Sequence, residues 1–268
     1  MTTSVLKLGG SVLRDDASYA SAARFLRDRL AANPDERLVV IVSARHGSTD
    51  ALLAEATGIV GHIDETTQDG LDLLWSTGEL RSVAILALHL RKAGVPAVPF
   101  NVHQTGLVAD RLAGTTVRPL RLVAALAHAR IVVVPGFLGI SAGDTITSLG
   151  RGGSDLTAVL LAAAVRADAC ELIKDVPGYF TADPHRERDA RPIHDLTFDE
   201  ALRMADAGCD LVQRAALVAA DTAALPLVIR SMDAAAPITR VHSQSHSRSR
   251  SSHGIRHQDD SRRPAVGA

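Results

Sequence analysis

The chain has 268 residues, of which 46% are hydrophobic and 22% charged, so it is long enough to bury one sizeable core. Its formal net charge of −1 gives no reason to expect nucleic acid or an anionic membrane as a partner. The apolar runs are interrupted too often for a membrane span, and the N-terminus reaches charge too early for a signal peptide. The two cysteines, Cys170 and Cys209, form no CxxC pair, so we expect a protein of the reducing cytoplasm without disulfides or a zinc site.

Short β-rich runs alternate with helical patterns along most of the chain. We expect buried strands at residues 4–8, 37–43, 95–100, 130–137, 170–176 and 225–231. Helices are expected near residues 17–32, 48–60, 70–93, 117–129, 154–168, 197–207 and 211–223. This alternation predicts an α/β fold with a mainly parallel central sheet. Because ligands of such sheets bind beyond the carboxyl ends of the strands, the loops after these strands are the expected site.

The alternation ends near residue 233. Residues 234–268 contain almost no large apolar side chains and cannot bury enough surface to offset the entropy cost of ordering. We therefore expect one folded domain over residues 1–233 and a disordered Ser/Arg/His-rich tail over 234–268. A tail that binds an anion or a metal is the alternative, but a solvated tail is favoured.

The first loop that suggests chemistry is "KLGGS", from Lys7 to Ser11. Two glycines after a strand let backbone N–H groups approach an anion, and Lys7 adds a positive charge beside them. A simple tight turn is the alternative, and the chain has no Walker A sequence. Of the 29 basic residues only Lys7, Lys92 and Lys174 are lysines. Because arginine cannot always replace a compact ammonium, Lys7 and Lys174, which end two expected strands, are candidates for chemistry.

Two further loops in the first half of the chain suggest a small charged ligand. In "SARHGSTDALL", Thr49 is either part of a helix cap or part of an anion site at the start of a helix. In "STGELRS", Glu79 lies within an otherwise apolar stretch, where a buried carboxylate needs a partner. That partner is either a structural arginine such as Arg81 or the ammonium group of a ligand.

The Gly-rich segment "SLGRGGSDLTAV" is where these signals converge. Its glycines bring the backbone close to a ligand, and Arg151 offers a planar fork that binds a carboxylate through two hydrogen bonds. Ser154 is expected to cap the following helix, with Asp155 in the first turn, where negative charge is favoured. Asp155 is also suited to receive an ammonium group or to orient a lysine. The segment predicts a site for a small zwitterion near a phosphate.

The chain resembles the amino acid kinase family, and within it the catalytic domain of aspartokinases. The motifs that carry the resemblance occur in the family's order: "KLGGS", "VSARHGSTDALL", "STGE", "VPGF", "SLGRGGSD", "KDVPGYFTADP" and "LVIRS". The resemblance covers residues 4–232. It implies a three-layer α/β/α fold of the amino acid kinase (carbamate-kinase-like) type, with an acceptor-binding lobe over residues 1–140 and a nucleotide-binding lobe over 141–233.

The resemblance also implies an activity and the residues that carry it. We expect a cytoplasmic homodimer that uses ATP and Mg²⁺ to phosphorylate the side-chain carboxylate of L-aspartate, without general-base catalysis because that carboxylate is already ionised. Lys7 and Asp155 are expected to be catalytic. The residues expected to hold the amino acid are Thr49, Glu79, Arg151, Gly153 and Ser154. Those expected to contact the nucleotide are Gly9, Gly10, Ser11, Lys174, Asp175, Phe180 and Asp183. No residue is expected to bind a metal directly.

Four positions near the expected nucleotide site depart from the aspartokinase pattern. Lys174 stands where that family usually has Thr or Ser, Phe180 where it has Tyr, His185 where it has Arg, and Asp210 where it has Lys. We expect Lys174 to supply the positive charge missing at the last two positions. Aspartokinases commonly carry regulatory ACT domains where only a polar tail follows residue 232, so we expect no inhibition of this chain alone by lysine or threonine.

Two other classes of function fit the sequence. A kinase of the same fold could act on another amino acid, a modified aspartate, or a phosphate or phosphonate, but an acceptor without an amine would leave Glu79 without a role. A non-catalytic binding protein on this scaffold would need neither Lys7 nor Asp155.

Overall fold

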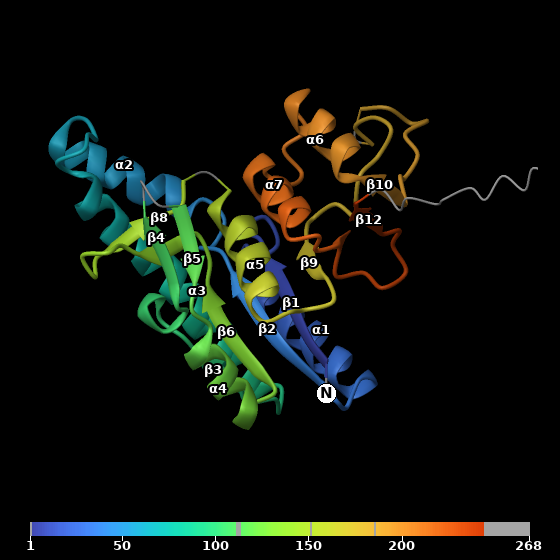
Figure 1. Cartoon of the computed structure of the whole chain (residues 1–268), viewed down its shortest axis with the longest axis horizontal. Coiled ribbons are helices and arrows are strands. Elements are labelled where there is room, and N and C mark those ends of the chain that lie inside the picture. The colour runs from blue at the N-terminus through green and yellow to red at the C-terminus, as the bar shows by residue number, and fades with distance from the viewer. Residues whose placement is uncertain (1, 111–113, 151, 185, 244–268) are drawn as a thin grey trace, which may run out of the picture.

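A computed structural model describes residues 2–110, 114–150, 152–184 and 186–243. Its centre is an eight-stranded sheet with the strand order β10-β12-β11-β9-β1-β2-β6-β3 (Figure 1). The strands are β1 (Thr2–Leu8), β2 (Glu36–Val42), β3 (Val98–Pro99), β6 (Ile131–Pro135), β9 (Cys170–Ile173), β10 (Asp195–Thr197), β11 (Leu227–Arg230) and β12 (Thr239–His242). All neighbouring strands are parallel except the antiparallel pair β11 and β12, which confirms the predicted mainly parallel sheet.

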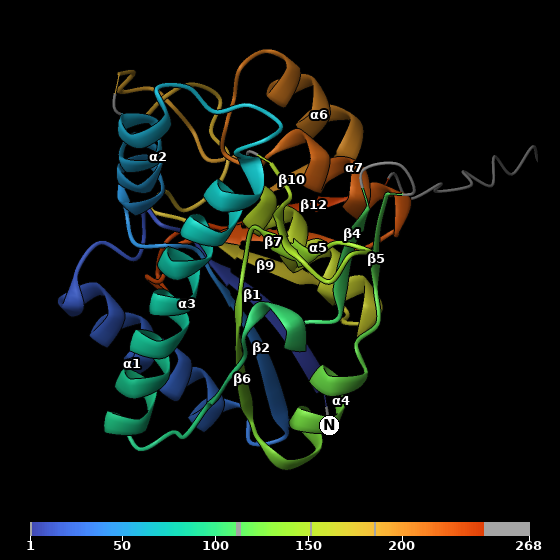
Figure 2. The same ribbon diagram turned by 90° about the vertical axis from the view of Figure 1, so that its left-hand side faces the viewer.

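Helices cover both faces of the sheet and so create three layers, which Figure 2 shows from the side. One layer contains α1 (Asp16–Ala32) and α3 (Gln68–Lys92). The other contains α4 (Leu120–His128), α5 (Gly153–Ala164), α6 (Phe198–Asp206) and α7 (Arg214–Thr222). The remaining helix, α2 (Ser48–Val60), follows β2, packs on α3 and has no buried residue. No helix in the described part of the chain is long and apolar enough to cross a membrane.

The buried strands are apolar on both sides because each side meets a helix layer. In β2, Val39 and Ile41 pack toward α4, α5 and α7. Leu38, Val40 and Val42 pack toward α1 and α3. Successive side chains of a strand point to opposite faces, so a sheet covered on both faces needs this continuous apolar run. The sequence therefore identifies β2 clearly.

A second sheet of four short strands, in the order β5-β4-β7-β8, is not predicted by the sequence. Its strands are β4 (Leu107–Asp110), β5 (Gly114–Val117), β7 (Leu138–Ile140) and β8 (Ile146–Ser148), and the 3-10 helix η1 (Val102–Gln104) precedes them. Each strand has only three or four residues, too few to establish an alternating pattern. β8 matters for function because it leads directly into the Gly-rich segment before α5.

The position of β12 corrects the predicted end of the folded domain. The sequence predicts disorder from residue 234 onward, yet β12 lies inside the central sheet between β10 and β11. Thr239 fixes the strand, because its buried hydroxyl accepts a hydrogen bond from the Tyr179 backbone N–H and donates one to the Ile193 carbonyl. The strand escapes prediction because "TRVH" has one large apolar side chain. Residues 244–268 of the predicted tail lie outside the described residues.

Strands from the two halves of the chain occupy different halves of the sheet. β1, β2, β6 and β3 form one half, and β9, β11, β12 and β10 form the other. β1 lies between β2 and β9, so its carboxyl end borders both halves. The division into an acceptor lobe and a nucleotide lobe stays a prediction, but this order places Lys7 where the two would meet.

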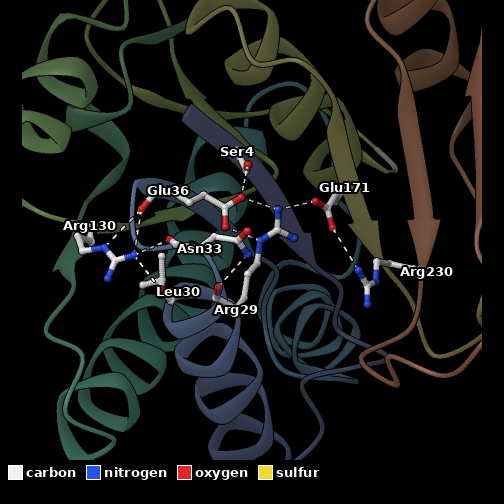
Figure 3. Close-up of polar contacts among 8 residues, drawn as sticks. All are labelled: Ser4, Arg29, Leu30, Asn33, Glu36, Arg130, Glu171 and Arg230. Atoms are coloured by element: carbon white, nitrogen blue, oxygen red, sulfur yellow. Dashed lines mark hydrogen bonds and ion pairs between the residues drawn. The ribbon is translucent and has the colours of Figure 1, made fainter. Parts of the chain in front are cut away.

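An ion-pair network joins α1 to the amino ends of the central strands (Figure 3). Arg29 donates to Glu36 through Nε at 2.9 Å and Nη2 at 2.7 Å, and its Nη2 also lies 2.7 Å from Oε1 of Glu171. Burial raises the pKa of Glu36, but Arg29 and the Ser4 hydroxyl outweigh this effect and lower it. Arg230 lies farther from Glu171, at 3.9 Å. Arg29 thus compensates two largely buried carboxylates.

We expect Arg29→Met to lower the free energy of unfolding by about 3–5 kcal/mol, because two largely buried carboxylates lose their nearest cation. Urea denaturation followed by circular dichroism at pH 7 measures the change. Arg27→Met on the same helix is the control, and its exposed side chain should matter by less than about 0.5 kcal/mol. Folding lowers the pKa of Glu36, so its contribution exists above the unfolded-state pKa and is lost as the pH falls. The difference in free energy of unfolding between Arg29→Met and the wild type should therefore become smaller at acidic pH. Equal free energies of unfolding at pH 7 would contradict this role of Arg29.

Candidate active site

A cavity of about 740 Å³ opens beyond the carboxyl ends of β1, β2 and β9. Its walls come from the loop after β1, the loop between β2 and α2, one face of α3, the segment from β8 into α5, and the end of β9. Three of these walls, the loops after β1 and β2 and the end of β9, follow parallel strands, where ligands of α/β folds bind.

Two lysines and one aspartate form a buried charge cluster in the cavity wall. Lys7 Nζ lies 2.7 Å from Oδ1 of Asp155, and Lys174 Nζ lies 2.8 Å from Oδ2. Burial raises the pKa of Asp155, but the two ammonium groups outweigh burial and bring it to about 2. Burial and the nearby Lys7 lower the pKa of Lys174. With both lysines charged, two positive charges and one negative charge leave a net charge of +1, which favours an anionic ligand.

Glycines allow the loops around this cluster to pack closely against neighbouring segments of the chain. A Cβ atom at Gly10 would lie 2.9 Å from the carbonyl oxygen of Ala44, so the loop after β1 packs directly on the loop after β2. Gly152 has φ of +73°, and a Cβ atom there would lie 1.9 Å from Cγ of Gln213. Gly152 is also the N-cap of α5, so the prediction that Ser154 caps this helix is wrong. Ser154 lies inside the first turn, where its side chain lines the cavity.

Four of the five residues predicted to hold an amino acid lie in the wall of the same cavity. Thr49, Glu79, Gly153 and Ser154 all line it. The N-cap of α2 is Gly47, with no side-chain cap, so Thr49 is not a capping residue. Arg151, the fifth predicted residue, lies outside the described residues.

Glu79 has the environment of a carboxylate that awaits a cation. The residue is 3% exposed, and burial raises its pKa to about 8 although the Ala44 backbone and the charge of Lys7 act to lower it. Within the described residues Oε2 has no hydrogen-bond partner and no ion pair joins Glu79 to Arg81. Because an unpaired buried carboxylate is costly, the geometry favours a ligand ammonium over a structural arginine.

The residues predicted to contact a nucleotide are only partly brought together. Gly10, Ser11 and Lys174 line the cavity. Ser11 donates a hydrogen bond of 3.0 Å to Asp175. Gly9 lies beside them, since a Cβ atom there would be 3.1 Å from Lys7 Nζ.

The other two predicted nucleotide residues lie farther along the loop after β9, and neither lines the cavity. Phe180 forms an isolated bridge with Pro192, and Asp183 pairs with Arg186 at 3.3 Å. Among the positions that depart from the aspartokinase pattern, Asp210 lines the cavity and His185 lies outside the described residues.

Comparison with known proteins identifies the family. A sequence model of the amino acid kinase family matches residues 2–231. The chain belongs to the amino acid kinase family. It is 35% identical over 232 residues to Aspartokinase 2 of Bacillus subtilis, an alignment that covers 85% of this chain and 55% of that protein. The chain thus spans about half the length of the curated relatives it matches.

Solved structures agree with this assignment. An aspartate kinase from Synechocystis superposes with a TM-score of 0.79 at 35% identity and covers 91% of this chain and 40% of that one. E. coli aspartokinase III in complex with aspartate and ADP gives 0.74 at 25% identity and covers 92% of this chain and 66% of that one. The predicted three-layer amino acid kinase fold is confirmed.

The sequence does not single out two aromatic residues in the site of this amino acid kinase. Trp75 and Phe137 both line the cavity, with ring centroids 5.2 Å apart and planes at 70°. Phe137 has φ of +68°, a conformation that is uncommon for residues other than glycine and that clusters at functional sites. The available signal was the spacing of Trp75, which precedes Glu79 by four residues and so shares its helix face.

The sequence also does not single out Asp72, a buried aspartate of this amino acid kinase. Oδ2 of Asp72 accepts a hydrogen bond of 3.0 Å from the Ser148 backbone N–H, and Oδ1 accepts one of 2.7 Å from Gln68. Asp72 thereby ties α3 to β8 and positions the segment that enters α5. Nothing in the local sequence marks a contact between residues this far apart.

Proposed function

We propose that this amino acid kinase transfers the γ-phosphoryl group of ATP to the side-chain carboxylate of L-aspartate, which gives 4-phospho-L-aspartate. The observation that carries the proposal is that the cationic cluster of Lys7, Asp155 and Lys174 faces the same cavity as the buried carboxyl group of Glu79, whose Oε2 has no hydrogen-bond partner among the described residues. The cluster suits a transferring phosphate, and Glu79 suits the α-ammonium group of an amino acid. The likeness to aspartate kinases, one of them in complex with aspartate and ADP, supports the same acceptor.

The chemistry needs no general base, because the acceptor carboxylate is ionised at neutral pH. A carboxylate oxygen forms a bond to the γ-phosphorus, the bond to the bridging ADP oxygen breaks, and ADP leaves with its electron pair. Lys7 and Lys174 offset the negative charge on the phosphoryl oxygens. Both oxygens of Asp155 are engaged by these lysines, so we assign Asp155 the role of positioning the two ammonium groups.

The residues of the cavity fit a polyphosphate. The loop with Gly9, Gly10 and Ser11 borders Lys7, and residues of the first turn of α5 line the same cavity, so that backbone N–H groups and two ammonium groups border one space. ATP would bind as its Mg²⁺ complex, in which the ion would supply positive charge at the phosphate oxygens. No residue is proposed as its ligand.

The remaining residues are assigned either to the amino acid or to the nucleotide. Thr49, Gly153 and Ser154 are proposed to hold the amino acid together with Glu79, and Arg151 stays a predicted member of this group. Asp175, Phe180 and Asp183 are proposed to border the nucleotide. Lys174 is proposed to supply positive charge in a cavity that also contains Asp210. A cytoplasmic location and a homodimer stay predictions.

The test is ADP release from Mg-ATP in the presence of a panel of carboxylic acids. We expect L-aspartate to stimulate release, and succinate, which has both carboxylates but no amine, to do so at least about 100-fold less efficiently because Glu79 is left unpaired. Release with another amino acid and none with aspartate would instead favour a same-fold kinase with a different acceptor. Release with none of the acids would contradict the proposal.

A further inference from the structure

The cavity face of α3 carries an aromatic residue that touches both flanks of the proposed amino acid site. The indole of Trp75 packs edge to face on Phe137 in the loop after β6, with centroids 5.2 Å apart. Its Nε1 donates a hydrogen bond of 3.1 Å to the carbonyl oxygen of Thr49 at the start of α2. Because Trp75 and Glu79 are four residues apart on one helix, the indole lies next to the carboxylate proposed to bind the ammonium group.

One of these flanks depends on the indole. α2 has no buried residue, so little apolar burial holds it in place, and its N-cap, Gly47, contributes no side-chain hydrogen bond. The bond from Trp75 is therefore a specific tie between the start of α2 and α3. It acts on Thr49, the residue of α2 that is proposed to contact the acceptor.

The other flank is fixed independently of Trp75. The backbone N–H of Phe137 donates a hydrogen bond of 3.1 Å to the Thr157 hydroxyl of α5, and Phe137 has a left-handed backbone with φ of +68°. The Phe137 backbone is thus held by α5, and the indole packs against its ring. Trp75 therefore contacts both the Phe137 ring and the weakly held start of α2.

We propose that Trp75 is a positioning and specificity-determining residue that sets the size of the acceptor site, by holding Thr49 at a fixed distance from Phe137 and walling the space beside Glu79. The inference rests on the proposed function, because it takes the acceptor to be an amino acid bound through its ammonium group. An aromatic wall at this place would oppose an additional methylene group, so the site would favour a short acceptor.

Two variants separate the two contacts of the indole. Trp75→Phe keeps a ring against Phe137 but loses the hydrogen bond to Thr49, and Trp75→Leu loses both. We expect the KM for L-aspartate to rise about tenfold in Trp75→Phe, consistent with one lost hydrogen bond, with the KM for ATP unchanged. In Trp75→Leu, the ratio of kcat/KM for aspartate to that for glutamate should fall at least about tenfold, the worth of one methylene group.

The matched control is Leu73→Ala, an exposed apolar residue of the same helix, which should change neither KM nor selectivity. A merely structural role for Trp75 would lower the thermal unfolding midpoint and affect both substrates alike. Unchanged aspartate KM and selectivity in both Trp75 variants would overturn the inference.

Trp75 is the only tryptophan of the chain, so the indole emission of the wild type reports on this position alone. Titration with L-aspartate should give a saturable change in emission, whereas Mg-ADP alone should give little. If an amino acid is phosphorylated but does not alter the emission, the inference fails while the proposed function stands. If no amino acid is phosphorylated, the proposed function fails. In that case, a change in emission caused by an amino acid would still support Trp75 as a wall of the site, and no change in emission would overturn the inference.

Discussion

Replacement of Lys7 by Met should lower kcat for phosphoryl transfer by about 10²–10³-fold, the usual effect of removing one charged or hydrogen-bonding group aimed at a developing anion. Lys174→Met should have an effect of similar size. Each ammonium group lies within 2.8 Å of a different oxygen of Asp155, and both lysines line the cavity. Because the two charges occupy different positions, we expect that the remaining lysine does not compensate for the one removed. Steady-state ADP release at saturating substrate measures the change.

The third lysine of the chain provides a matched control. Lys92 is exposed at the end of α3, far along the helix from the cavity-lining residues, and Lys92→Met should leave kcat unchanged. Methionine has a side chain of similar length, and in each active-site variant Asp155 keeps the other lysine, so folding should be preserved. Wild-type kcat in Lys7→Met would contradict the assignment of this residue to the transferring phosphate.

Replacement of Glu79 by Gln should raise the KM for L-aspartate by about 100-fold at pH 8, because it removes the buried carboxylate that pairs with the ammonium group. The dependence of the KM for L-aspartate on pH should change as well. The pKa of Glu79 is raised by burial to about 8, so below that pH the free enzyme must lose a proton before it can pair with an ammonium group. The wild-type KM should therefore fall by up to about tenfold per pH unit between pH 6 and 8. The Glu79→Gln profile should be nearly flat over that range.

Stability provides an independent check of the same group. Folding raises the pKa of Glu79 from 4.5 to about 8, so the folded state holds an extra proton between these values and loses stability as the pH rises through them. The free energy of unfolding of Glu79→Gln, relative to the wild type, should grow by roughly 1.4 kcal/mol per pH unit in this window. A difference that does not vary with pH would show that Glu79 is already ionised and paired in the free protein.

Strand ends and loops could be predicted from the sequence because their signals are local. The apolar run that contains Val39 and Ile41 identifies β2, and the Gly-rich segments identify where loops of the chain approach one another closely, as at Gly10 and Gly152. The sequence also predicts Lys7 and Lys174 at the ends of strands. Their contact with one aspartate required the pairing of β1 with β9, which places Leu8 opposite Ile173 and so aligns the two strand ends.

What escaped prediction depends on contacts between distant segments. The edge-to-face contact of Trp75 with Phe137 joins residues on α3 and on the loop after β6, and neither local sequence indicates the other. β12 is too short to carry an alternating pattern, and it is stabilised by Thr239 contacts with two distant backbone groups. Such features follow from the register of the assembled sheet, which sequence periodicity does not specify.

The measurement that tests the proposed function most directly is trapping of the product with hydroxylamine. An acyl phosphate reacts with hydroxylamine to form a hydroxamate and inorganic phosphate, whereas phosphate esters do not. With Mg-ATP and L-aspartate, we expect hydroxamate in equal amount to the ADP released, and none when aspartate is omitted. Aspartate-dependent ADP release without hydroxamate, or hydroxamate only with a different acid, would contradict phosphorylation of the aspartate side-chain carboxylate.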